Sequence, residues 1–188
     1  YVRPILEFSC QVWSPHLKCD IAQIERVQRS YTRRIPGLSD LNYAERLRAC
    51  DTLSLEHRRL YLDLVLLYNI VHGHSDVTLH SIGLTPVCNS KLRNYGYHIY
   101  TSFIPSSSLS LYCFSHRTSK LWNNLPRSFY SLSLNAFKCN ILKLDLPSLA
   151  RALSRLMGLS VEINKLNKLK KINYYAFATN EEQMFVTT

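Results

Sequence analysis

Apolar side chains recur at helical spacing through most of the first 72 residues. On a helical wheel with about 100° per residue, the first group of apolar side chains covers an arc of about 160° of the circumference. This group consists of Val2, Ile5, Leu6, Phe8, Val12 and Trp13. Pro4 suits the first turn of such a helix, and Ser14-Pro15 would end it. A second helix is predicted from His16 to about Arg34, with a stripe formed by Leu17, Ile21, Ile24, Gln28, Tyr31 and Ile35.

Two more helices are predicted before residue 73. Asn42, followed by Glu45 three residues later, resembles a capping box before a short helix. Ser54 then begins a long helix that reaches His72 and is apolar on both sides. A helix of this kind has to be covered on both sides, so we expect it at the centre of the fold.

The pattern changes after residue 72. Residues 73–110 are loop-rich, and "NYGYHIYTSF" alternates like a short strand or hairpin arm. Helical spacing returns over 111–123 and again from Ser133 to Pro147. We therefore predict a mainly α-helical protein with a small β or loop insertion, divided into segments 1–72, 73–110, 111–146 and 147–188, the last a helical or poorly ordered tail. Trp13 and Trp122 are predicted to pack in the core rather than to bind ligands.

The charge is strongly positive, at +10 with a pI near 9.4. Residues 1–63 carry 10 basic and 8 acidic side chains, whereas residues 64–146 carry 7 and 2. Such an excess favours polyanionic partners. Two groups could contact a nucleic-acid backbone: Arg26, Arg29 and Arg33 on one face of the second helix, and Lys91 and Arg93 with Tyr95, Tyr97 and Tyr100. The alternative is a solvated charged face, with Asp20 and Glu25 close enough to weaken its field.

Motifs of catalysis and metal binding are missing from the sequence. It has no G-x-S-x-G elbow, no phosphate-binding glycine loop, and no Cys/His set at zinc-ligand spacing. His72-Gly73-His74 is interpreted as a surface turn, and the six cysteines as reduced thiols. We therefore expect no enzymatic activity, no cofactor, no small-molecule substrate and no membrane span, in a protein of the cytoplasm or nucleus.

Two stretches resemble a known family. "RPILEFSCQVWSP" followed by "IERVQRSYTR" resembles the segment after the polymerase palm in reverse transcriptases of LINE-type, non-LTR retrotransposons, especially Jockey-like elements. Phe114, Ser115 and Arg117, then "LWNNLP" and "SLNAFK", resemble the C-terminal pattern of the same proteins. The likeness extends from Tyr1 to about Leu146, and residues 147–188 depart from it.

The resemblance implies a helical thumb that holds the RNA template and the DNA/RNA hybrid by their phosphates. The candidate backbone contacts are then Arg26, Arg29, Arg33, Arg34, Lys91, Arg93, Arg117 and Lys120. The catalytic [FY]-x-D-D motif of the palm does not occur in this chain. The resemblance therefore implies a polymerase fragment without catalytic aspartates, whose apolar first helix would pack on the missing palm.

Two other interpretations stay open at this stage. The chain could be a helical module that binds a protein or itself through the faces left exposed. It could also be a degenerate open reading frame without a selected function.

Overall fold

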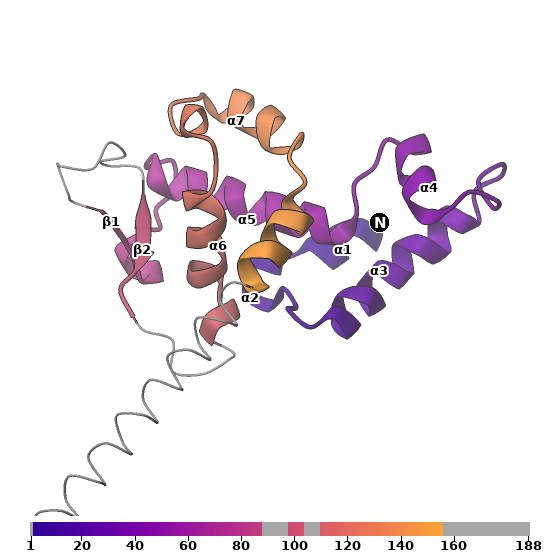
Figure 1. Cartoon of the computed structure of the whole chain (residues 1–188), viewed down its shortest axis with the longest axis horizontal. Coiled ribbons are helices and arrows are strands. Elements are labelled where there is room, and N and C mark those ends of the chain that lie inside the picture. Colours follow the sequence, from indigo (N-terminus) through magenta and orange to yellow (C-terminus); the bar gives the residue numbers. More distant parts are fainter. Residues whose placement is uncertain (1, 88–97, 104–109, 156–188) are drawn as a thin grey trace, which may run out of the picture. The chain divides into compact units, whose positions relative to one another are not determined.

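The computed structural model describes residues 2–87, 98–103 and 110–155, and it is mainly α-helical, as predicted (Figure 1). Residues Tyr1–Ala150 form one compact unit, and Arg151–Thr188 form a second. The predicted segments 1–72, 73–110 and 111–146 thus lie within a single unit. Most of the predicted tail, 147–188, lies outside the described residues.

The N-terminal segment forms two short helices, α1 (Val2–Glu7) and α2 (Cys10–Trp13). Ser9 separates them in the left-handed conformation, with φ of 49°. The prediction of one continuous helix was wrong, because this turn directs Cys10 into the core, where it is completely buried. Much of the predicted apolar arc is exposed instead: Ile5 at 74%, Phe8 at 77% and Val12 at 87%.

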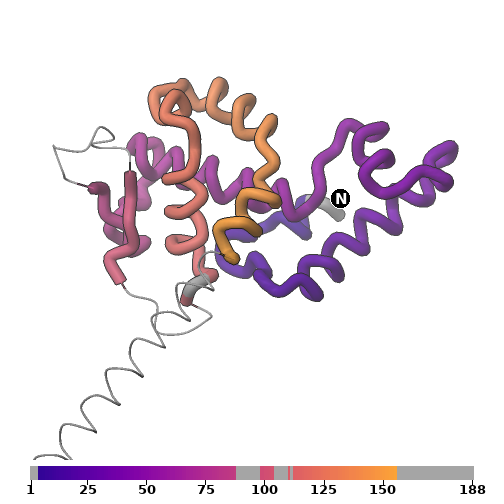
Figure 2. The backbone as a smooth tube through the Cα atoms, viewed as in Figure 1, coloured from indigo at the N-terminus to yellow at the C-terminus, as the bar shows by residue number. Residues whose placement is uncertain are grey.

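Helix α3 (Lys18–Arg33) is followed by the shorter α4 (Tyr43–Ala49). The chain turns back after α3 so that α4 lies beside it (Figure 2). The capping box of α4 is present as predicted: the Asn42 side chain accepts from the Glu45 amide at 3.0 Å, and the Asn42 amide donates to the Glu45 carboxylate at 2.8 Å. This box fixes where α4 begins.

Helix α5 (Leu55–Val71) is the central element, as predicted. It contacts α1, α2, α3, α6 and α7, and Ser54 caps it by accepting from the His57 amide at 3.2 Å. Its buried side chains include Leu60, Leu64 and Leu67. Neighbours on several sides explain why its sequence is apolar around most of its circumference.

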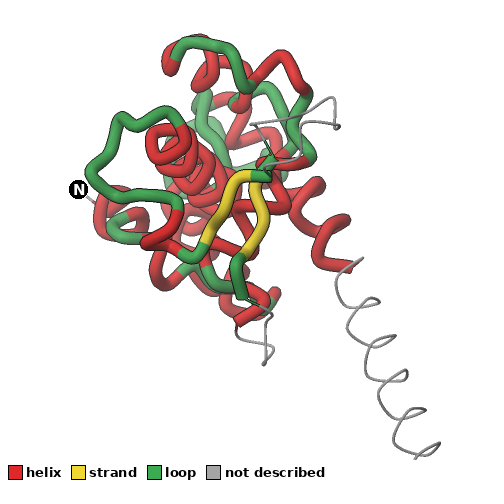
Figure 3. Tube along the Cα trace, turned by 90° about the vertical axis from the view of Figure 1, so that its left-hand side faces the viewer, coloured by secondary structure: helices red, strands yellow, loops and turns green. Residues whose placement is uncertain are grey.

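A small hairpin follows α5, shown in yellow in Figure 3. Strands β1 (Leu84–Pro86) and β2 (Ile99–Thr101) pair antiparallel, with Leu84 opposite Thr101. The side chain of Asn123 bonds both backbone groups of Ile99, at 2.7 and 3.1 Å. The predicted strand in this stretch is thus confirmed at β2, and the hairpin is attached to the helix that carries Asn123.

The C-terminal part of the unit contains α6 (Phe114–Asn123) and α7 (Leu134–Ile141). Short 3-10 turns precede each of them, η2 (Ser110–Tyr112) and η3 (Arg127–Phe129), and a further turn, η1 (His80–Ile82), precedes β1. Trp122, Tyr130 and Phe137 pack together in the core. Residues 146–155 are also helical.

The two tryptophans differ in burial. Trp122 is fully buried, as predicted. Trp13 is 39% exposed, with its indole N–H donating to the Phe8 carbonyl at 2.7 Å and its ring 6.0 Å from the Arg59 guanidinium. The prediction of a core position was therefore wrong for Trp13, which lies at the edge of the core.

The cysteines and the hydropathy of the helices can be compared with the expectations from the sequence. The five cysteines in the described part of the chain are free thiols, of which Cys10 is buried and Cys19 and Cys139 are exposed. Burial raises the pKa of the Cys10 thiol to about 11. Within the described ranges, no helix has the length and apolar character needed to cross a membrane.

Candidate nucleic-acid interface on helix α3

Three of the predicted arginines share one exposed face of α3. Arg26, Arg29 and Arg33 are separated by three and four residues, the spacing that places side chains on one side of a helix, and all three are exposed. Arg26 and Arg33 make no ion pair with any described residue. We call these three residues the arginine face; it extends along about 10 Å of the helix axis.

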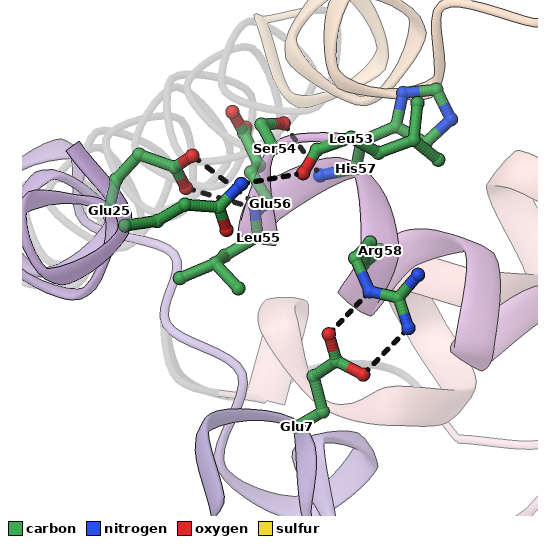
Figure 4. A network of polar contacts seen from close by, with 9 residues as sticks. Glu7, Glu25, Leu53, Ser54, Leu55, Glu56, His57 and Arg58 are labelled. Carbon is green, nitrogen blue, oxygen red and sulfur yellow. Dashed lines mark hydrogen bonds and ion pairs between the residues drawn. The ribbon is translucent and has the colours of Figure 1, made fainter. Parts of the chain in front are cut away.

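The carboxylate of Glu25, which precedes Arg26 in the sequence, is turned into the protein. Glu25 is only 5% exposed, and it accepts hydrogen bonds from the backbone amides of Leu55 at 3.2 Å and Glu56 at 3.3 Å, at the start of α5 (Figure 4). It also accepts from the hydroxyl of Tyr43. Glu25 therefore caps α5, and its carboxylate lies at the positive end of that helix.

Asp20 is also placed away from the arginine face. At about 100° per residue, Asp20 projects at least about 120° around the helix from each of the three arginines. Asp20 thus lies on another side of α3, whereas Glu25 stays close to Arg29 through Tyr43, to which both are joined, so the weakening of the field by Glu25 stays a prediction.

Arg29 is held by a neighbouring aromatic ring. Its guanidinium lies 4.8 Å from the centroid of the Tyr43 ring on α4, a cation–π arrangement. Burial, and then the hydrogen bond to Glu25, raise the pKa of the Tyr43 phenol, so this hydroxyl stays protonated as a donor. The contact orders Arg29 while leaving it exposed to solvent.

Arg34 lies apart from the arginine face. It is the C-cap residue of α3, with its amide donating to the Tyr31 carbonyl at 3.0 Å. Its side chain lines a groove of about 590 Å³ between α1, α3 and the start of α5. The structure thus separates Arg34 from the other three arginines that the sequence grouped with it.

Arg117 is engaged inside the protein. Its guanidinium makes a two-pronged ion pair with the buried Asp63 at 2.8 and 3.2 Å, and it donates to the carbonyls of Tyr112 at 3.0 Å and Gln11 at 2.8 Å. These contacts join α6, α5 and α2. Burial raises the pKa of the Asp63 carboxyl, and Arg117 opposes that shift. We therefore leave Arg117 out of the candidate interface.

The other predicted cations are not brought to the arginine face. Lys120 is half-buried on α6, and burial lowers the pKa of its ammonium group. Lys91 and Arg93, with Tyr95 and Tyr97, lie outside the described residues, whereas Tyr100 on β2 is 53% exposed.

Sequence reasoning missed the polar contacts that fix this part of the fold. Besides Glu25, a two-pronged ion pair joins Glu7 of α1 to Arg58 of α5, with its longer contact at 2.8 Å (Figure 4). Gln28 adds a bond of 2.9 Å to the carbonyl of Leu53. One signal was available, since Glu25 lies on the helical wheel beside Ile21 and Gln28 of the predicted buried stripe.

The described residues contain no group of His, Cys, Asp and Glu side chains suited to holding a metal ion. The arginine face presents a row of exposed guanidinium groups. Such groups pair with phosphate oxygens through parallel N–H donors.

Comparisons with known proteins give one weak relative. The chain is 32% identical over 76 residues to an uncharacterized protein of Caenorhabditis elegans, a match that covers 39% of this chain and 38% of that protein. No family model matches the chain, and no solved structure matches it significantly.

Proposed function

We propose that this chain corresponds to the thumb and post-thumb region of a LINE-type reverse transcriptase, and that it binds the phosphate backbone of nucleic acid through the arginine face. The ligand would be an RNA template or a DNA/RNA hybrid. The palm and its catalytic aspartates would belong to another part of the parent protein, so this chain by itself would have no polymerase activity.

One observation carries the binding proposal: the only carboxylate in the middle of α3 is buried. Because Glu25 caps α5, the central turns of α3 present arginines to solvent with no acidic side chain among them. A charged helix face is usually solvated and often carries both signs. An arginine row of one sign, with Arg29 ordered by Tyr43, is better suited to phosphate contact.

The motif positions support the proposed origin. The first motif, Arg3–Pro15, covers α1 and α2, and the second, Ile24–Arg34, covers the part of α3 that carries the arginine face. Arg58 and Glu7 connect α1 to the central helix. The motif residues thus belong to one packed group of helices, as expected for a thumb-like element.

The test is the salt dependence of binding to a labelled DNA/RNA hybrid, followed by fluorescence anisotropy. Each phosphate contact contributes about 1 to the slope of log K against log salt, so the triple variant Arg26→Gln, Arg29→Gln, Arg33→Gln should lower that slope by about 3. Two hybrids of different sequence should bind alike, because phosphate contacts carry no sequence information.

A matched control removes the same charge elsewhere. Arg48, Arg127 and Lys143 are exposed and lie outside the arginine face. Their triple Gln variant should keep most of the wild-type slope. If the slope fell equally in both triple variants, binding would depend on net charge alone and the proposal would be overturned. Wild-type binding that did not change between about 50 and 200 mM salt would overturn it as well.

A further inference from the structure

The groove next to Arg34 is a second candidate site, and it lies on another side of α3 from the arginine face. Its walls come from Leu6 of α1 and from Val27, Tyr31 and Ile35 on or just after α3, and Leu55 of α5 also lines it. Its volume of about 590 Å³ is in the range of ligand and peptide sites.

Large parts of these walls are open to solvent. Tyr31 is 70% exposed and Val27 is 42% exposed, although both are apolar or aromatic. Both side chains line the same groove. Exposed apolar side chains grouped in this way mark an interaction site more often than a single exposed side chain does.

The charge of the groove comes from one residue. Of the described residues that line it, only Arg34 carries a full charge at neutral pH, and it makes no ion pair with a described residue. Tyr31 and Arg34 are three residues apart and therefore neighbours at the end of α3. Tyrosine and arginine are the side chains that, with tryptophan, contribute most often to binding energy at protein interfaces.

We propose that this groove binds an amphipathic helix of a protein partner, with the apolar side of that helix on Tyr31 and Val27 and an acidic side chain paired with Arg34. Residues of α1, α3 and α5 line the groove, a setting in which a further helix can pack by its apolar positions at i, i+3, i+4 and i+7.

Charge argues against a second copy of this chain as the occupant. The chain carries a net charge of +10, and the described lining of the groove has no carboxylate to meet the Arg34 of another copy. In a two-fold dimer formed through this groove, each copy would bring one Arg34 and no carboxylate of the described lining to the shared surface. An acidic partner is complementary where a second copy is not.

The test is a selection of helical peptides against the full chain, by mRNA display from a library with apolar residues fixed at helical spacing and its charged positions randomised. We expect enriched peptides to share one acidic position. Their affinity should fall about tenfold or more in Tyr31→Ala and in Arg34→Gln, consistent with interface hot spots. A peptide in which the shared Asp or Glu is replaced by Asn or Gln should bind the wild-type chain with a similar loss of affinity. The same peptide change should cost little further affinity in Arg34→Gln, because the partner of the acid is already absent there.

Arg33→Gln is the matched control, because it removes the same charge from the adjacent residue on the arginine face. It should change peptide affinity less than about twofold, since rim charges outside the contact contribute little. Circular dichroism should show Tyr31→Ala folded, because that side chain is mostly exposed. This test is independent of nucleic-acid binding, so either proposal can fail while the other stands.

Three outcomes would overturn the inference. The first is a selection that enriches no helical peptide. The second is a set of peptides that bind Tyr31→Ala and Arg34→Gln as tightly as wild type. The third is a dimer, detected by light scattering, that is lost in Tyr31→Ala, which would assign the groove to a second copy.

Discussion

Glu25 shows how one buried carboxylate organises the N-terminal half of the protein. Burying a charge is costly unless hydrogen bonds and an opposite charge compensate it. Glu25 has both forms of compensation: two backbone amides and the Tyr43 hydroxyl donate to it, and the positive end of the α5 dipole lies in front of it. Since α3 supplies the carboxylate and α5 the amides, this cap joins two helices that are distant in sequence.

Replacing Glu25 by Ala should therefore destabilise the protein by about 2 to 3 kcal/mol, because it removes a helix cap and leaves buried amide donors unpaired. Glu25→Gln should cost less, because the amide oxygen can still accept one of these bonds. The measurement is the free energy of unfolding in urea. Asp76→Ala, at an exposed carboxylate, is the control and should stay within about 0.5 kcal/mol of wild type. A Glu25→Ala variant as stable as that control would contradict the capping role.

For individual residues, the sequence predicted the exposed charged positions better than the buried polar ones. The spacing of Arg26, Arg29 and Arg33 was enough to place them on one face, because helical periodicity is a local property. The inward position of Glu25 depends on amides 30 and 31 residues further along the chain. The groove beside Arg34 likewise depends on Leu6 and Leu55, which line it from distant parts of the sequence.

Among the elements, the break between α1 and α2 is the main departure from the predicted helices. The pattern of apolar positions favoured a single helix, but the helix is interrupted at Ser9, whose φ of 49° is unfavourable for a residue with a Cβ atom. Cys10 is buried and Glu7 pairs with Arg58, so both short helices are attached to α5. Tertiary contacts thus outweigh the local preference for a continuous helix.

Substitutions at Ser9 should distinguish a broken from a continuous helix by the sign of their effect. In the left-handed conformation glycine is the favoured residue, so Ser9→Gly should be more stable than Ser9→Ala by about 1 kcal/mol. In a continuous helix the order would be reversed by a similar amount, because alanine is the better helix former. Thermal unfolding of the two variants measures the difference, and a more stable alanine variant would contradict the observed turn.

The other helices show which boundaries local sequence can specify. The ends marked by capping residues were predicted well: Asn42 with Glu45 begins α4, and Ser54 begins α5. These signals work because the capping side chain and the amides it bonds lie within one turn. The hairpin could be predicted only as a single strand near residue 100, because its pairing depends on β1 some fifteen residues earlier.

Across the whole molecule, the core contains more polar side chains than the apolar patterns suggested. Arg59 and Asp63 of the central helix α5 are almost completely buried, and Arg117 of α6 pairs with Asp63. Periodicity located the central helix because most of its surface is covered by apolar neighbours. It could not locate the partners of Asp63, because the pairing with Arg117 spans 54 residues of sequence.

Histidines in this core make the stability of the fold depend on pH. Burial lowers the pKa of His57 and of His116, and Lys120 lowers that of His116 further. Each ring has a buried nitrogen, Nε2 of His57 and Nδ1 of His116, without a hydrogen-bond partner. The folded state therefore favours neutral rings, whereas the unfolded chain takes up these protons at a pH of about 6.5. This contribution to stability is complete above that pH and is lost as the pH falls through it.

We accordingly expect the urea midpoint of unfolding to be lower at pH 5.5 than at pH 7.5, and His116→Gln to reduce that difference by removing one of the groups responsible. His80→Gln, at an exposed position, is the control and should keep the full wild-type difference. The comparison uses the change between the two pH values within each variant, so an overall loss of stability in His116→Gln does not affect it. If His116→Gln kept the full difference as well, protonation of this buried ring would not contribute to acid destabilisation, and the pH dependence would have to come from other groups.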